Sequence, residues 1–93
     1  MEDKITNEKI KKYKAMTTSA LEIVKKSIIK NKESEAKEII DMTSNYLSDA
    51  AHFEKSGDFV NSFAALNYAH GWIDSGVRLG VFDVDDDKLF TIK

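Results

Sequence analysis

The chain has 93 residues and no cysteine, and its 14 basic and 16 acidic side chains leave a formal net charge of −2. This length allows one domain with one hydrophobic core and leaves no room for a separate catalytic domain. Without cysteine there is no disulfide framework, no thiolate nucleophile and no thiolate metal site, and no stretch approaches the roughly 20 apolar residues of a membrane-spanning helix. We therefore expect a single soluble, cytoplasmic domain over residues 1–93, with no membrane partner.

The charge changes sign along the chain. Residues 1–40 carry ten lysines against seven acidic residues, whereas residues 41–93 carry four basic residues against nine acidic ones. We interpret both charged sets as the solvated faces of a small helical domain.

The first predicted helix covers about residues 7–30. Thr6 or Asn7 can cap its start, and Asn31 can take a left-handed conformation after its end. Residues that fit one buried stripe recur every three or four positions along it: Ile10, Tyr13, Thr17, Ala20, Leu21, Val24 and Ile28.

The second and third predicted helices, at about residues 33–56 and 58–80, form a tight antiparallel hairpin. Gly57 can adopt positive φ without steric strain, and Asp58 directly after it can cap the next helix. Proline is absent from the whole chain, so nothing interrupts either helix. The sequence predicts an all-α, antiparallel three-helix bundle with a short C-terminal tail at 81–93, in which Val81 and Phe82 fold back on the core.

The third helix is apolar on two faces, so it must pack against more than one neighbour. Within it, Gly71 and Gly76 each cost roughly 0.8 to 1 kcal/mol relative to alanine, and close approach of another helix is the simplest reason for both. We predict an interaction surface for a protein partner or for a homodimer, made of Tyr68, Gly71, Trp72 and Gly76.

Residues 68–80, YAHGWIDSGVRLG, form the most distinctive run of the chain. Further matching positions lie before and after it: Tyr46, Asp49, Ala50, Phe53, Gly57, Asp58, Ala64 and the closing Leu89, Phe90 and Thr91. This pattern, over about residues 40–93, resembles the archaeal domain of unknown function 357. The resemblance implies a small helical domain and transfers no catalytic residue.

Polar residues follow one flank of the third helix at steps of three and four. Such a row is either a polar lattice that fixes the register of the helices or a small binding site in which Arg78 and His70 contact an anion and Asp74 orients them. Two residues of the second helix are candidate partners across the hairpin, so the full predicted cluster is Tyr46, Asp49, Asn67, His70, Asp74 and Arg78.

Motifs for catalysis, cofactors and metals are missing from the sequence. It has no glycine-rich phosphate loop and no serine with an evident histidine and acid, so we expect no enzyme and no cofactor. His70 with Asp74 supplies only two ligands, fewer than a stable transition-metal site needs. The run Asp83, Asp85, Asp87 begins like a calcium loop, but Lys88 stands where that loop requires glycine, so we read it as an exposed acidic turn.

The sequence therefore favours a non-enzymatic protein-interaction or self-association module. The alternative is a small-anion or RNA-binding domain that uses Arg78, His70 and the lysine-rich first helix. The lysines of that helix are spread over several faces, and Tyr13 is the only aromatic residue among them, so nucleic acid is the less favoured partner.

Overall fold

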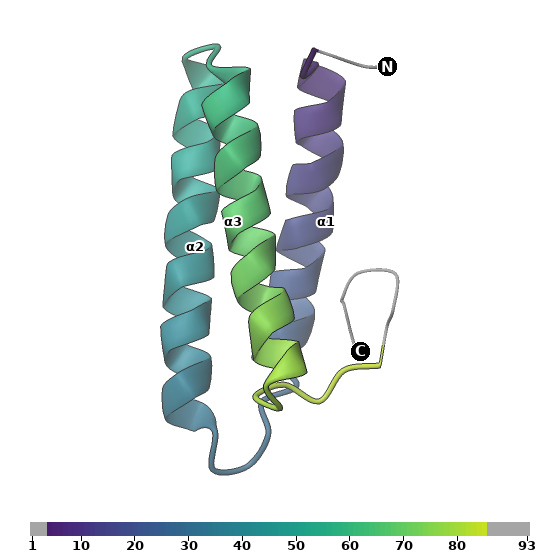
Figure 1. Ribbon diagram of the computed structural model, residues 1–93, viewed down its shortest axis with the longest axis vertical. Helices are drawn as coiled ribbons and strands as arrows, with labels where there is room; N and C mark the ends of the chain where they lie inside the picture. Colours follow the sequence, from purple (N-terminus) through teal and green to yellow (C-terminus); the bar gives the residue numbers. More distant parts are fainter. Residues whose placement is uncertain (1–3, 86–93) are drawn as a thin grey trace.

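The computed structural model describes residues 4–85, which form three helices: α1 (Asn7–Lys25), α2 (Glu33–Lys55) and α3 (Phe59–Arg78). Successive helices run antiparallel, so α1 and α3 point the same way (Figure 1). The α2–α3 interface is the largest, and α1 packs more on α3 than on α2. The predicted all-α three-helix bundle is confirmed. None of the three helices is long and apolar enough to cross a lipid bilayer.

The turn between α2 and α3 has the predicted chemistry. Gly57 has a φ of 82°, and the Asp58 side chain accepts a hydrogen bond from the Asn61 amide at 3.1 Å. The Gly57 amide donates to the Glu54 carbonyl at 3.0 Å, and the Asp58 amide donates to the Phe53 carbonyl at 2.8 Å. This pair of bonds is the Schellman motif, which satisfies the last carbonyls of a helix when glycine follows its end.

The first helix ends at Lys25 rather than near Lys30, because the residues after it pair with the chain beyond α3. Ile28 and Phe82 form an isolated antiparallel bridge. The Ile29 amide donates to the Val81 carbonyl at 2.9 Å, and the Asp83 amide donates to the Ser27 carbonyl at 2.7 Å. A helical backbone at 27–29 could not make these bonds. Asn31 does adopt positive φ, 74°, but within the connection to α2.

The core consists of two hydrophobic clusters along the bundle. The smaller one is Ile10, Ala50, Ala65 and Leu66, and the larger one, at the end where α3 finishes, is Ala20, Leu21, Val24, Ala36, Ile39, Ile73, Val81 and Phe82. Val81 and Phe82 are 4% and 3% exposed, so this part of the tail folds back on the core as predicted. The closing LFTI at 89–92, and residues 86–88 of the acidic turn, lie outside the described residues.

Gly76 faces this larger cluster, not solvent. A Cβ at Gly76 would lie 2.6 Å from Cε2 and 2.9 Å from Cδ2 of Phe82, and 2.8 Å from Cδ1 of Ile39. Including Gly76 in an exposed interaction surface was therefore wrong. The close approach expected there is made within the chain, by the ring of Phe82.

The substitution Gly76→Ala should destabilise the fold, although alanine is the better helix former. Overpacking a filled core costs about 1 to 3 kcal/mol, which exceeds the roughly 1 kcal/mol gained in helix propensity. The matched control is Gly71→Ala in the same helix, where a Cβ would have no described atom within 4 Å; this change should raise stability. Chemical denaturation followed by circular dichroism at low protein concentration measures both. If both substitutions changed the free energy of unfolding in the same direction, this account of Gly76 would be contradicted.

Candidate functional site

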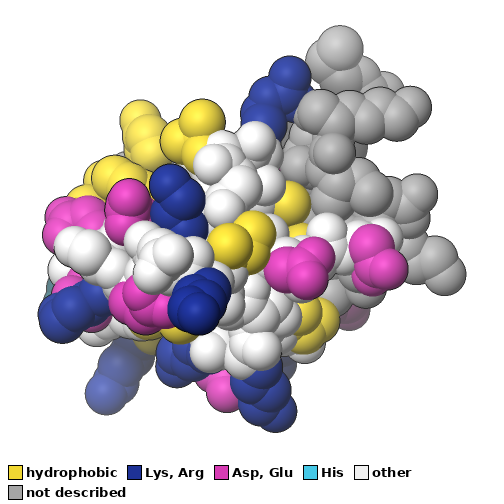
Figure 2. All heavy atoms as spheres, turned by 90° about the horizontal axis from the view of Figure 1, so that it is seen from below, with side chains coloured by type: hydrophobic (Ala, Val, Ile, Leu, Met, Phe, Trp, Pro, Cys, Tyr) yellow, Lys and Arg dark blue, Asp and Glu magenta, His cyan; other side chains and the backbone are white. Residues whose placement is uncertain are grey.

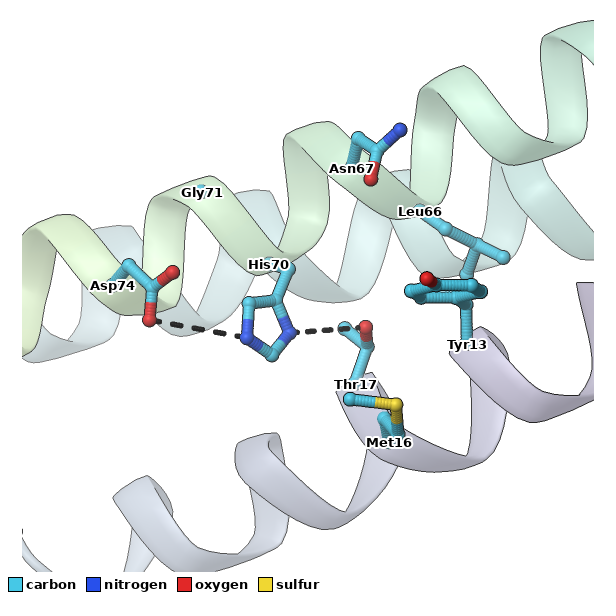
Figure 3. A pocket seen from close by; sticks show the side chains of 8 residues that line it. All are labelled: Tyr13, Met16, Thr17, Leu66, Asn67, His70, Gly71 and Asp74. Carbon is cyan, nitrogen blue, oxygen red and sulfur yellow. Dashed lines mark hydrogen bonds and ion pairs between the residues drawn. The ribbon is translucent and has the colours of Figure 1, made fainter. Parts of the chain in front are cut away.

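A cavity of about 250 Å³ lies between α1 and α3 (Figure 3). Three successive turns of α3 face the same stretch of α1 across it, because residues three and four apart share a helix face. Its lining consists of Tyr13, Met16 and Thr17 from α1 and Leu66, Asn67, His70, Gly71 and Asp74 from α3. The cavity thus has apolar walls with a few polar groups, which is the usual composition of a small-ligand site.

His70 is the centre of the polar groups. Its Nδ1 lies 3.2 Å from Oγ1 of Thr17, and its Nε2 lies 3.8 Å from Oδ1 of Asp74. The direction of the hydrogen bond between the Thr17 hydroxyl and Nδ1 depends on the tautomer of the ring, and the contact of Nε2 with Asp74 is an ion pair when the ring is protonated. The imidazole therefore joins α1 to α3 through Thr17 and faces Asp74 one turn further along α3.

An alcohol, an imidazole and a carboxylate in sequence also make up the hydrolase triad, but here the alcohol is enclosed. Thr17 is only 2% exposed, and a nucleophile must reach its substrate. The arrangement fits a polar link that holds two helices in register better than it fits an attacking group. Within residues 4–85, no group of three or more histidine, aspartate or glutamate side chains is placed to hold a metal ion.

The structure divides the predicted polar cluster. Asn67, His70 and Asp74 line the cavity. Tyr46 instead stacks on Tyr68, with ring centroids 5.4 Å apart and an interplanar angle of 21°. The other two members, Asp49 on α2 and Arg78 at the end of α3, are exposed and do not line the cavity.

The contribution of α1 to the cavity was missed by sequence reasoning. Tyr13, Met16 and Thr17 come from a helix far away in the chain, so no local pattern pairs them with His70. One signal was available, because Thr17 is a polar residue within the apolar stripe of the first helix. A buried hydroxyl needs a partner, and His70 supplies it.

A second hollow, of about 320 Å³, lies on the side of α3 that faces away from the core. It is lined by Asn67, Tyr68, Gly71, Trp72 and Ser75. Tyr68 is 63% exposed and Trp72 is half-buried against the larger core cluster. We call Val60, Ala64, Asn67, Tyr68, Gly71, Trp72 and Ser75 the outer face of α3.

Several lysines counted toward a basic surface make contacts within the chain. The Lys9 ammonium lies 5.2 Å from the ring centroid of Phe63, and Lys14 Nζ lies 3.5 Å from Oε1 of Glu54. At the end of the bundle seen in Figure 2, basic and acidic side chains are intermixed. Among the described residues at this end, neither positive nor negative side chains form a broad patch of their own.

One exposed ion pair on α2 changes a pKa. Lys37 Nζ donates a hydrogen bond to Oδ2 of Asp41 at 2.8 Å. This hydrogen bond, followed by the negative charge of Asp41, raises the pKa of Lys37. The pair lines neither the cavity nor the second hollow, so it takes no part in the candidate site.

Replacing Thr17 with valine should destabilise the bundle by about 0.5 to 1.5 kcal/mol, the net contribution of one hydrogen bond. The matched control is Thr43→Val. Thr43 is equally buried, but its hydroxyl donates to the Ile39 carbonyl of its own helix at 2.8 Å, so its removal breaks no bond between two helices. Urea denaturation of both variants measures the difference. Equal losses would mean that the bond to His70 adds nothing.

Comparison with known proteins places the chain in a family. Neither curated proteins nor solved structures gave a match. A family described as a protein of unknown function (DUF357) matches over residues 12–82. The match begins earlier than the resemblance over about residues 40–93 indicated, so most of α1 belongs to the matched region. The match ends at Phe82, whose ring covers Gly76. The chain is a member of the DUF357 family.

Proposed function

We propose that this protein is a non-enzymatic interaction module and that the outer face of α3 docks a helix of another protein chain. Gly71 is the observation that carries the proposal. A glycine inside a helix costs roughly 0.8 to 1 kcal/mol relative to alanine. That cost is offset where a side chain at the position would prevent a close contact.

The other three glycines have a use within the chain. Gly57 and Gly80 have φ values of 82° and 77°, which L-residues with side chains rarely adopt. Gly76 makes room for Phe82. Gly71 has an ordinary helical conformation, and a Cβ there would have no described atom within 4 Å. A use outside the chain, the close approach of a partner helix, gives this glycine a reason.

The exposed residues around Gly71 support the same proposal. Those of α3 from its start to Ser75 carry no charge: Val60, Asn61, Ala64, Asn67, Tyr68, Gly71 and Ser75. In contrast, more than half of the exposed residues of α1 and α2 are lysine, aspartate or glutamate. Interface centres are depleted in charge and enriched in tyrosine and tryptophan, and Tyr68 and Trp72 flank Gly71.

The cavity around His70 gives less support to the alternative of an anion site. Asp74 brings a carboxylate into its lining, and Arg78 is not among the lining residues. A negative charge beside the ring opposes the binding of a phosphate or carboxylate.

The substitution Gly71→Gln should weaken docking at least tenfold, which corresponds to about 1.4 kcal/mol, because a long side chain then stands where the partner backbone approaches. The fold should be retained, since glutamine favours helix and the site is open. Sedimentation velocity over a range of concentrations reports self-association. Capture from an extract of the source cells after nuclease treatment reports other protein partners.

The matched control is Ala15→Gln, which adds the same side chain to an exposed position of α1 and should leave docking unchanged. Equal docking by the Gly71→Gln variant and the wild type would overturn the proposal. So would binding that disappears on nuclease treatment, because the partner would then be a nucleic acid.

A further inference from the structure

We infer that the helix docked on the outer face of α3 is α3 of a second copy of this chain, antiparallel and crossing at Gly71, with each Tyr68 seated in the second hollow of the other copy. This inference rests on the proposed function and names its partner. It follows from the positions of one protruding side chain, one hollow and one glycine along the same helix.

The protruding group is Tyr68, three residues before Gly71. It is 63% exposed, and one face of its ring is supported by Tyr46 of α2. A supported aromatic side chain loses little further conformational entropy when it is buried by a partner, which favours its use as an anchor.

The hollow lies on both sides of Gly71: Asn67 and Tyr68 line one part of it, and Trp72 and Ser75 line the part that receives the ring from the second copy. Tyr68 and Trp72 are four residues apart, so they share the flank of α3 next to α2. The volume of the hollow is about 320 Å³. Trp72 offers an aromatic surface and Ser75 a hydroxyl, which match the ring and the phenolic hydroxyl of a tyrosine.

Symmetry places these two features opposite each other. Consider a twofold axis that passes through Gly71, lies in the interface and is perpendicular to α3. This axis makes the two α3 helices antiparallel. It sets Tyr68, three residues before Gly71, against residues 74 and 75 of the second copy, three and four residues after Gly71. The same axis keeps the flank beside α2 opposite its own image. Each Tyr68 therefore meets the hollow of the second copy, which is the mutual contact of an isologous interface.

The charge distribution also fits a second copy. Near a twofold axis a charged side chain lies close to its own image, and two like charges repel. The outer face of α3 carries no charged residue. A parallel pair would set Tyr68 against Tyr68 and leave both hollows unfilled, so the antiparallel arrangement is favoured.

The absence of cysteine from the chain makes the register directly testable by single cysteines and oxidation with copper phenanthroline. In the antiparallel pair Gly71→Cys should form a disulfide-linked dimer. Ala64→Cys alone should not, because seven residues on each side of the axis separate the two thiols by about 21 Å along the helices at about 1.5 Å per residue, beyond disulfide reach. An equimolar mixture of Ala64→Cys and Arg78→Cys chains should form a mixed dimer, because these positions lie opposite each other.

Ala15→Cys on the exposed side of α1 gives the background rate of collision, and the expected pairs should react at least tenfold faster. The mixed dimer keeps Gly71 unchanged, so it reports the register even where a side chain at 71 hinders docking. Adding Tyr68→Ala to both chains of the mixture should lower its rate at least tenfold. An unchanged rate would overturn the seating of Tyr68 in the hollow.

Two other experimental outcomes distinguish a failure of this inference from a failure of the proposed function. Ala64→Cys chains that crosslink with themselves as fast as Gly71→Cys chains would show a parallel pair, which overturns the inference and leaves docking on α3 intact. A monomer mass at all concentrations, with no crosslinking above background, would exclude a second copy. The proposed function would then depend on whether Gly71→Gln abolishes capture of another protein.

Discussion

The contact of the Phe82 ring with Gly76 is the constraint on which the rest of the structure depends. It can form only because Gly76 lacks a side chain, and it holds the segment after α3 against the core, where residues 81–83 pair with residues 27–29. That pairing ends α1 at Lys25 and sets the course of the connection to α2. One contact between distant parts of the chain thus determines where a helix stops, how the helices are connected and how the larger core cluster is closed.

Once α3 has this position, its flanks have different roles. The flank toward α1 packs within the chain, where His70 is hydrogen-bonded to the buried Thr17 and the cavity lies beside them. The flank toward α2 and solvent carries a stacked tyrosine, a half-buried tryptophan and an open glycine. The apolar rows of α3, with Ala65, Leu66, Ala69 and Ile73 among their members, are buried within the bundle, and the outer face of α3 is the side that the chain leaves exposed.

Sequence reasoning succeeded where a structure is determined locally. The cap at Asp58, the turn at Gly57 and the apolar stripes each follow from the chemistry of a few neighbouring residues, so the bundle and its hairpin were predicted. It failed where a distant residue decides. The end of α1 depends on Val81 and Phe82, the role of Gly76 depends on Phe82, and the cavity depends on Thr17, which no spacing rule pairs with His70. Gly71 and Gly76 look alike in sequence, and only their surroundings separate them.

The buried link between Thr17 and His70 also bears on the proposed docking, although it lies on the other flank of α3. Burial of the core residues, among them Ile10, Leu66 and Ile73, holds the helices together, but the hydrophobic effect has no direction. A hydrogen bond between a side chain of α1 and one of α3 favours one register of the two helices, because the bond is lost when one helix slides past the other. A fixed α3 presents Tyr68, Gly71 and Trp72 in one geometry. Binding then requires less ordering of the protein, and more of the contact free energy appears as affinity. In the proposed docking, the link between Thr17 and His70 thus supports the outer face of α3 without contacting the partner.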